Sequence, residues 1–324
     1  MNRSPNLVRL LERRARALRR HLPRAIAGDD TGVHQARVAS RRLREAVPVL
    51  TNGLDGSKRG KARKKIRRLT RALGTVRELD VTLTLLEEMA EKPGVSRPAV
   101  GDVRAHVIEE RERRRAIMHE RLETVNTDKL AKRLECVRRA LLEPSPGHNW
   151  RAALAARIVK RARRLDRAIA DAGQIYAPEA LHQVRIAAKK LRYVVEIANE
   201  SGAAPAALTV RTLKRVQDAL GRLHDLQVLQ HHVAAVAAGP RAVQRDTPDV
   251  GLAVLARWIE DECRHLHGRY IAMLPSLREA LETARLQVAV RLTAPRRSRA
   301  AKMQLPARPR QAVRRRSEQA GGRG

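Results

Sequence analysis

The chain has 324 residues, 43% of them hydrophobic, and carries 68 lysines and arginines against 34 aspartates and glutamates, a formal net charge of +34. This length allows one large or two medium domains, and the charge indicates a polyanionic partner: nucleic acid, an acidic membrane surface or a phosphate polymer. The two cysteines form no CxxC motif and no run of 18 residues is apolar, which argues against a disulfide framework and a membrane span and favours the cytoplasm.

Helical periodicity runs through the first half of the chain. It predicts helices at residues 5–27, 30–51, 58–91 and 98–143. We expect Gly28 to end the first helix and Asp29 or Asp30 to cap the second. The fourth helix is expected to break at residues 126–128, where the sequence reads Asn-Thr-Asp.

The second half has the same organisation. Its predicted helices are residues 150–172, 178–201, 205–238 and 249–291. The Pro-Ser-Pro-Gly segment at 144–147 marks the boundary, so we expect two four-helix halves, residues 1–145 and 146–293. Residues 294–324 hold ten basic residues and one acidic residue without apolar periodicity, which predicts a disordered basic tail.

Two segments of the chain recur in the same order. VHQARVASRRLREAV at 33–47 matches LHQVRIAAKKLRYVV at 181–195, a shift of 148 residues. LTRALGTVRELDVTLTLL at 69–86 matches VQDALGRLHDLQVLQHHV at 216–233, a shift of 147 residues. The order and spacing indicate an internal duplication of the four-helix unit.

The segment 33–47 separates into two faces on a helical wheel. Leu43, Ala36 and Val47 form an apolar face, and a basic stripe lies within an arc of about 80° beside it. The stripe consists of His34, Arg37, Arg41 and Arg44, and its counterpart in the second half of His182, Arg185, Lys189 and Arg192. Arg42 and Lys190 lie off the stripes, yet both are basic.

Basic residues also share a face of the third predicted helix. Lys64 and Arg68 correspond to Arg211 and Arg215, although other cations of this face are not repeated. Like charges one helical turn apart cost roughly 0.2–0.5 kcal/mol per pair without an anion. Because guanidinium rows suit phosphate oxygens, the repeated stripes indicate a bound polyphosphate-like anion. The two histidines either donate a proton-dependent bond to phosphate or only anchor their helices.

These motifs resemble those of the CHAD domain family, the conserved histidine α-helical domain. Its signature helix resembles HxxRVAxRRLR, which matches His34–Arg44 and His182–Arg192, and the segments LGTVRELD and LGRLHDLQ also resemble the family's. The resemblance covers about residues 1–291. It implies two four-helix bundles related by a pseudo-twofold axis, with the basic helices facing a central pore or groove. It further implies binding of inorganic polyphosphate and, in bacteria, association with polyphosphate granules.

The predicted function is therefore non-catalytic polyphosphate binding by an all-α protein, without cofactor or metal and without membrane insertion. The predicted contact residues are His34, Arg37, Arg41, Arg42, Arg44, Lys64, Arg68, His182, Arg185, Lys189, Lys190, Arg192, Arg211 and Arg215.

Three alternatives remain open at this level. A nucleic-acid-binding protein fits the charge and could use the basic tail, but aromatic residues for base stacking make up only 2% of the chain. A metal-dependent phosphohydrolase could use the His224-Asp225 dipeptide, but its counterpart in the first half is Arg77-Glu78. A helical scaffold that packs its basic stripe on an acidic protein also fits.

Overall fold

The computed structural model describes residues 5–54, 56–74, 76–143, 148–239 and 249–293. Every regular element in these ranges is helical, which confirms the all-α fold class. Residues up to Thr293 form one compact unit. The predicted boundary at 145–146 and the predicted tail at 294–324 lie outside the described residues, so the division into two four-helix halves stays a prediction.

The first two helices follow the expected pattern. Helix α1 spans Pro5–Ile26 and helix α2 spans Asp30–Leu50, separated by Gly28 with a φ of 84°. Asp29 caps α2, because its Oδ2 accepts a hydrogen bond from the Gly32 amide at 2.6 Å. The apolar face predicted for α2 is fully buried, with Ala36, Leu43 and Val47 at 0% exposure.

The prediction of a single helix at residues 58–91 is wrong. The structure has two helices there, α3 (Gly56–Ala72) and α4 (Arg77–Ala90), with a turn at Leu73-Gly74 between them. The Gly74 amide donates to the Arg71 carbonyl at 3.1 Å, which closes the end of α3. Glycine lowers helix stability, and the apolar periodicity that continues through this turn concealed the break.

The break predicted in the fourth helix is confirmed. Helix α5 (Arg97–Glu123) ends before it, and α6 (Thr127–Leu142) begins within it, so the break lies at residues 124–126. Asn126 caps α6 by accepting a hydrogen bond from the Lys129 amide at 2.7 Å.

The helices of the second half are longer. They are α7 (Trp150–Ala172), α8 (Pro178–Glu200), α9 (Ala207–Ala237) and α11 (Val250–Glu282), followed by the π-helix η1 (Thr283–Val288) and α12 (Ala289–Thr293). Helix α9 continues through Gly221, the position that corresponds to Gly74, and α11 continues through Pro275. The bounds of α7, α8 and α9 agree with the predicted ranges to within two residues, whereas the single helix predicted at 249–291 is divided into α11, η1 and α12.

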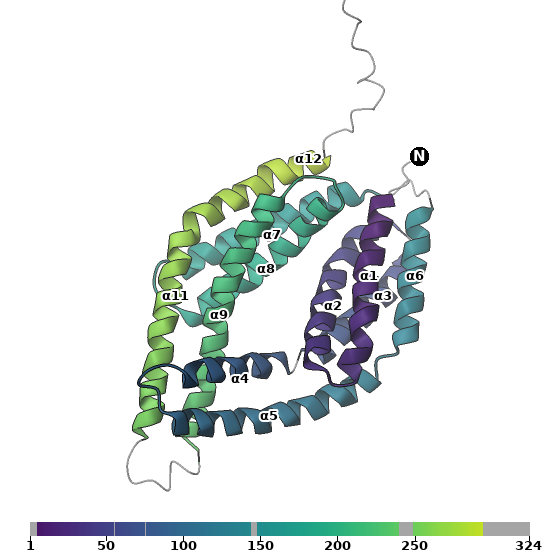
Figure 1. Cartoon of the computed structure of the whole chain (residues 1–324). Helices are drawn as coiled ribbons and strands as arrows, with labels where there is room; N and C mark the ends of the chain where they lie inside the picture. The colour runs from purple at the N-terminus through teal and green to yellow at the C-terminus, as the bar shows by residue number, and fades with distance from the viewer. Residues whose placement is uncertain (1–4, 55, 75, 144–147, 240–248, 294–324) are drawn as a thin grey trace, which may run out of the picture. The chain divides into compact units, whose positions relative to one another are not determined.

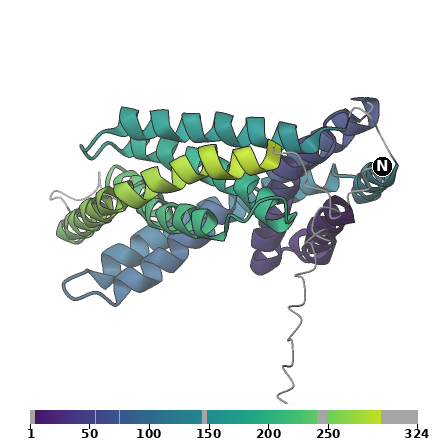
Figure 2. The ribbon, with the colours of Figure 1, turned by 90° about the horizontal axis from the view of Figure 1, so that it is seen from above.

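The packing of the helices crosses the two halves of the sequence. Helices α1, α2, α3 and α6 pack together, as do α7, α8, α9 and α11, with α12 on α7 (Figure 1). The hairpin of α4 and α5 packs on α9 and α11 (Figure 2). Helix α2 in turn contacts α4, α7 and α8. Both signature helices, α2 and α8, therefore meet inside one unit, together with the start of α4.

Candidate functional site

The basic stripes of α2 and α8 approach each other in the structure. Arg37 and Arg41 of α2 lie close enough to Arg185 and Lys189 of α8 for their charges to affect one another's pKa values. We call these four residues the central cations. Burial, followed by the charges of the other central cations, lowers the pKa of Lys189 to about 7, and burial and Arg41 lower that of Arg37 to about 10.

Carboxylates do not neutralise all of this charge. Within the described residues, none of the four central cations has a carboxylate at ion-pair distance. Glu78, on the first turn of α4, and Asp225 of α9 act electrostatically on Arg185. Burial raises the pKa of Asp225, while the charge of Arg185 opposes that shift. The site therefore keeps a local excess of positive charge at the four central cations.

The two central arginines that correspond in sequence have different surroundings. Arg37 donates from Nη1 to the Gly74 carbonyl at 3.0 Å, which is available because α3 has ended. The corresponding Arg185 packs beside Gly221, inside the continuous α9: its Nε lies 3.9 Å from where a Cβ on Gly221 would stand. Its Nε is buried and has no hydrogen-bond acceptor in the described part of the chain. Arg185 thus retains a donor that an external anion could satisfy.

The histidine of α8 bonds to another histidine. His182 Nδ1 and His224 Nδ1 of α9 lie 3.1 Å apart, so one ring donates and the other accepts. Burial and the charge of Arg185 lower the pKa of His224 to about 4, and burial also lowers the pKa values of His182 and His34. Neutral rings at pH 7 fit an anchoring contact between α8 and α9. In the sequence His224 stands out only as a candidate metal ligand, and its contact with His182 was not predicted.

Two predicted contact residues are held by acids or amides of their own chain. Arg192 donates to Glu196 Oε1 at 2.6 Å and to Gln217 Oε1 at 2.9 Å. Arg44 lies 3.9 Å from Glu45, at the edge of ion-pair range. These pairs lock Arg192 into the packing of α8 on α9, so it is less available to a ligand than the central cations.

The off-stripe cations lie against other helices. Arg42 Nε is 3.7 Å from Glu196 Oε2, an ion-pair distance but too long for a hydrogen bond. Burial, followed by the charge of Arg161 on α7, lowers the pKa of Lys190. Arg42 lines a pocket between α1 and α2, and Lys190 lines a pocket between α7 and α8. Neither pocket includes a central cation.

The predicted contacts on α3 and α9 are exposed. Lys64 and Arg68 line a groove of about 790 Å³ between α3 and α5, whose other charged residues are Arg67, Arg71 and Arg121. Arg211 and Arg215 are exposed on α9. The structure brings neither pair into the electrostatic surroundings of the central cations.

Residues at the start of α4 also belong to the central site. Arg77 and Glu78 act on Arg37, and Arg77 acts on His34. Sequence reasoning missed them, although they belong to the repeated LGTVRELD segment and correspond to His224 and Asp225. In the described ranges no group of three His, Cys, Asp or Glu side chains could hold a metal ion, and no described helix is long and apolar enough to cross a membrane.

The chain is similar to one protein family and to solved structures with the same fold. Residues 9–234 match the family model described as CHAD domain. A crystal structure of the CHAD domain from the plant Ricinus communis is 21% identical with a TM-score of 0.54, covering 86% of this chain and 91% of that one. PptA from Streptomyces chartreusis is 17% identical with a TM-score of 0.54, covering 88% of this chain and 99% of that one.

Those two similarities concern the fold, since both identities are low. No curated protein sequence matches the chain. The family match stops before α11, whereas the resemblance in the sequence was expected to extend to about residue 291. It includes both signature helices, the α4–α5 hairpin and almost all of α9. On this match, the chain belongs to the CHAD domain family.

Proposed function

We propose that the chain binds inorganic polyphosphate, without turning it over, at the central cations of α2 and α8. One observation carries the proposal: four cations from two helices converge, and none of the four has a carboxylate at ion-pair distance in the described residues. Family membership supports it, because the CHAD resemblance implies a polyphosphate ligand.

The electrostatics of the site favour a polyanion over isolated counterions. Burial, together with the three neighbouring guanidinium groups, makes a charged Lys189 unfavourable in the free protein and lowers its pKa to about 7. A chain of phosphates that contacts several of these cations relieves their repulsion and releases condensed counterions. Arginine offers bidentate donors to phosphate oxygens and lysine a compact charge. Polyphosphate has no bases, so the site needs no aromatic platform.

The decisive experiment removes the central cations together. The quadruple variant Arg37→Ala, Arg41→Ala, Arg185→Ala, Lys189→Ala is expected to fold and to lose polyphosphate affinity by about 100-fold or more, measured by calorimetric titration at fixed salt. The matched control removes four exposed cations of α5, α6 and α11 with Arg104→Ala, Lys132→Ala, Arg257→Ala and Arg269→Ala. An equal loss in both variants would show that binding depends on net charge alone and would reject the site.

A competition experiment separates polyphosphate from nucleic acid. Long-chain polyphosphate is expected to displace a labelled single-stranded DNA at equal phosphate concentration, because a DNA ligand would depend on stacking that this site does not offer. Failure to displace the DNA would favour a nucleic-acid-binding protein.

Turnover and cellular location have their own tests. We expect no phosphate release from polyphosphate with or without added divalent metal, and release above background would make the chain an enzyme. A fluorescent fusion is expected to follow polyphosphate granules in the cytoplasm, and the quadruple variant to become diffuse.

A further inference from the structure

The off-stripe cations Arg42 and Lys190 have no place in the central site, yet both signature helices carry one. Each of them lines a separate pocket between its signature helix and the helix before it. The α1–α2 pocket has a volume of about 150 Å³ and the α7–α8 pocket about 260 Å³. Liquid water occupies about 30 Å³ per molecule, so each pocket has room for a small hydrated ion.

The signature-helix walls of the two pockets are made of corresponding residues. In the α1–α2 pocket the wall consists of Gln35, Val38, Ala39 and Arg42. In the α7–α8 pocket it consists of Gln183, Ile186, Ala187 and Lys190. Each residue of the second wall lies 148 positions after its counterpart, the same shift that relates the signature helices. Two walls with the same amide, apolar, small and basic positions indicate that the pockets take the same kind of ligand.

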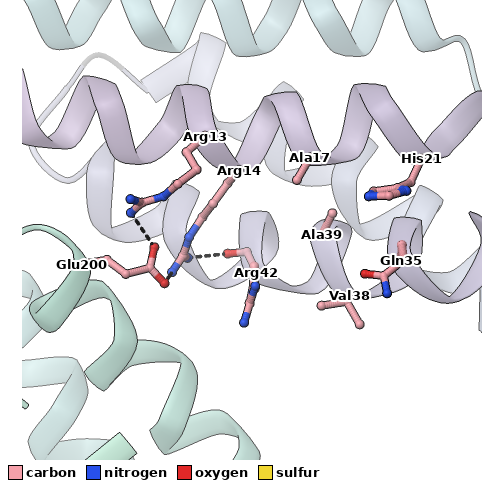
Figure 3. Close-up of a pocket in the computed structure, with 9 residues that line it drawn as sticks. All are labelled: Arg13, Arg14, Ala17, His21, Gln35, Val38, Ala39, Arg42 and Glu200. Atoms are coloured by element: carbon pink, nitrogen blue, oxygen red, sulfur yellow. Dashed lines mark hydrogen bonds and ion pairs between the residues drawn. The ribbon is translucent and has the colours of Figure 1, made fainter. Parts of the chain in front are cut away.

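The α1–α2 pocket contains a buried arginine whose donors are not all used (Figure 3). Only 3% of the Arg14 side chain is exposed; its Nη1 donates to the Arg42 carbonyl at 3.0 Å and its Nη2 to Glu200 at 3.2 Å. Arg14 Nε, Arg42 Nε and His21 Nδ1 are buried without a hydrogen-bond partner in the described residues. Buried polar nitrogens of this kind are normally paired. Arg42 Nε lies 3.7 Å from Glu196 Oε2, so Arg14 Nε and His21 Nδ1 are the two nitrogens beside this pocket that indicate a missing partner.

The charges around both pockets favour an anion as that partner. Of the described residues that line the α1–α2 pocket, Glu200 alone is a carboxylate, against Arg13, Arg14 and Arg42, and Arg42 also lies 3.7 Å from Glu196. Of those that line the α7–α8 pocket, Asp171 alone is a carboxylate, against Arg161, Arg164, Arg167 and Lys190. Arg161 is paired with Glu45 at 3.5 Å, so Arg164, Arg167 and Lys190 supply the excess charge there. Burial lowers the pKa of Arg14 more than Glu200 raises it, so its charge is not fully compensated.

The pocket in Figure 3 also has the shape for a compact ligand. Ala17, Val38 and Ala39 leave an apolar hollow, with Arg14, Arg42 and Glu200 toward one end and His21 and Gln35 toward the other. A tetrahedral phosphate offers several acceptor oxygens and can be bound by guanidinium, imidazole and amide donors at once.

We propose that these two pockets are a pair of phosphate-binding sites, each holding one phosphate group beside the signature helix. The pair is distinct from the central cations and does not depend on the proposed polyphosphate function. The phosphate group can come from free orthophosphate or from the end of a polyphosphate chain. The α7–α8 pocket is expected to bind more tightly, because Glu200 competes for Arg13 and Arg14 in the other one.

The test is a titration with orthophosphate in a phosphate-free starting buffer, followed by calorimetry and phosphorus NMR. We expect saturable binding of two phosphates per chain. Ala187→Leu fills the α7–α8 pocket and Ala17→Leu fills the α1–α2 pocket, and neither removes a cation. Each is expected to abolish one equivalent, and the tighter one is expected to disappear with Ala187→Leu. Lys190→Gln should weaken that equivalent at least tenfold, while the exposed control Arg104→Gln leaves both unchanged.

Two further arms separate this proposal from the central site and identify the source of the phosphate. The Arg41→Ala, Lys189→Ala variant is expected to lose polyphosphate affinity but keep both orthophosphate equivalents, so either proposal can fail alone. Tripolyphosphate binding that is lost in Ala187→Leu supports chain ends, and binding of orthophosphate alone supports the free ion. Absence of saturable orthophosphate binding, or binding that neither leucine variant changes in a folded protein, would show that the pockets hold only water and overturn the proposal.

Discussion

The two signature helices carry nearly the same residues but face different neighbours. Beside α2, the segment with the LG motif is broken into α3 and α4, and the free Gly74 carbonyl accepts a hydrogen bond from Arg37. Beside α8, the corresponding segment is the continuous helix α9, and Arg185 has a buried Nε without an acceptor in the described residues. The same arginine is thus partly satisfied in one half and left for a ligand in the other.

A second difference is the residue one turn further along each signature helix. Helix α2 has the guanidinium of Arg41 there, whereas α8 has the amine of Lys189, whose pKa falls to about 7. Helix α8 therefore carries both the arginine with a buried donor that is free in the described residues, Arg185, and the residue that makes the site pH-sensitive, Lys189.

Polyphosphate affinity should depend on the charge state of Lys189. A bound polyanion raises the lysine pKa, so binding takes up a proton, and affinity is expected to fall as pH rises above 7, by up to about 100-fold between pH 7 and 9. Lys189→Arg, which copies α2, should remove most of this dependence. The histidine pKa values are lowered, so these rings do not titrate in this range. Unchanged pH dependence in the arginine variant would contradict the role of Lys189.

Lys189 should also affect the free protein. Its pKa is lower in the folded state than the value of about 10.4 in an unfolded chain, so the unfolded state binds more protons between pH 7 and 10. The free energy of unfolding should therefore rise with pH across this window without polyphosphate, and Lys189→Arg should flatten that rise.

The two corresponding arginines should contribute unequally. Arg185→Ala is expected to weaken polyphosphate binding by about tenfold, and Arg37→Ala by about threefold, because Arg37 already donates to Gly74. Stability should show the reverse order: Arg37→Ala is expected to lower the free energy of unfolding by about 1 kcal/mol, and Arg185→Ala by less. Calorimetry and urea denaturation of both variants check the order. Equal effects on affinity would show that the break between α3 and α4, which frees the Gly74 carbonyl for Arg37, does not influence ligand binding.

The histidine pair should matter for packing more than for ligand. His224→Ala removes the partner of His182 and is expected to lower the free energy of unfolding by about 1 kcal/mol, with less than a threefold change in polyphosphate affinity. His34→Ala is the comparison in the first half, where Arg77 stands at the position of His224. A tenfold loss of affinity in His224→Ala at unchanged stability would instead place the imidazoles against the ligand.

The exposed faces of α3 and α9 should have the smallest effect. Lys64→Ala with Arg68→Ala, or Arg211→Ala with Arg215→Ala, is expected to change affinity less than threefold at 0.15 M salt, because these cations are solvated and screened. If a long polyphosphate reaches these cations, each one removed should reduce the slope of log affinity against log salt concentration by about one unit relative to the unmodified protein. A loss of affinity as large as that of Arg185→Ala would show that the binding site includes the exposed faces of α3 and α9.

The sequence predicts the local features of the site well. Helical period assigned Leu43 and Val47 of α2 to the core, and both are fully buried. Asn126 marked the start of α6 because its side chain caps that helix. The paired stripes were found because the signature segment recurs, and a repeat is visible without coordinates.

Features that depend on packing between distant segments could not be predicted in this way. Gly74 and Gly221 occupy corresponding positions in similar sequences, yet only the first lies at a helix break. The choice depends on where the following helix packs, since α4 leaves its own half to pack on α9. The contact between His182 and His224 likewise joins two residues that are 42 positions apart in the sequence, and the residues that flank each histidine do not indicate it.

The central claim is that the stripes of α2 and α8 form one polyanion site, and a structure of the protein with bound polyphosphate tests it most directly. We expect continuous phosphate density between the two helices, with oxygens at hydrogen-bond distance from both Arg41 and Lys189 and an acceptor at Arg185 Nε. Phosphate density confined to the exposed faces of α3 and α9, with no phosphate at the central cations, would contradict it.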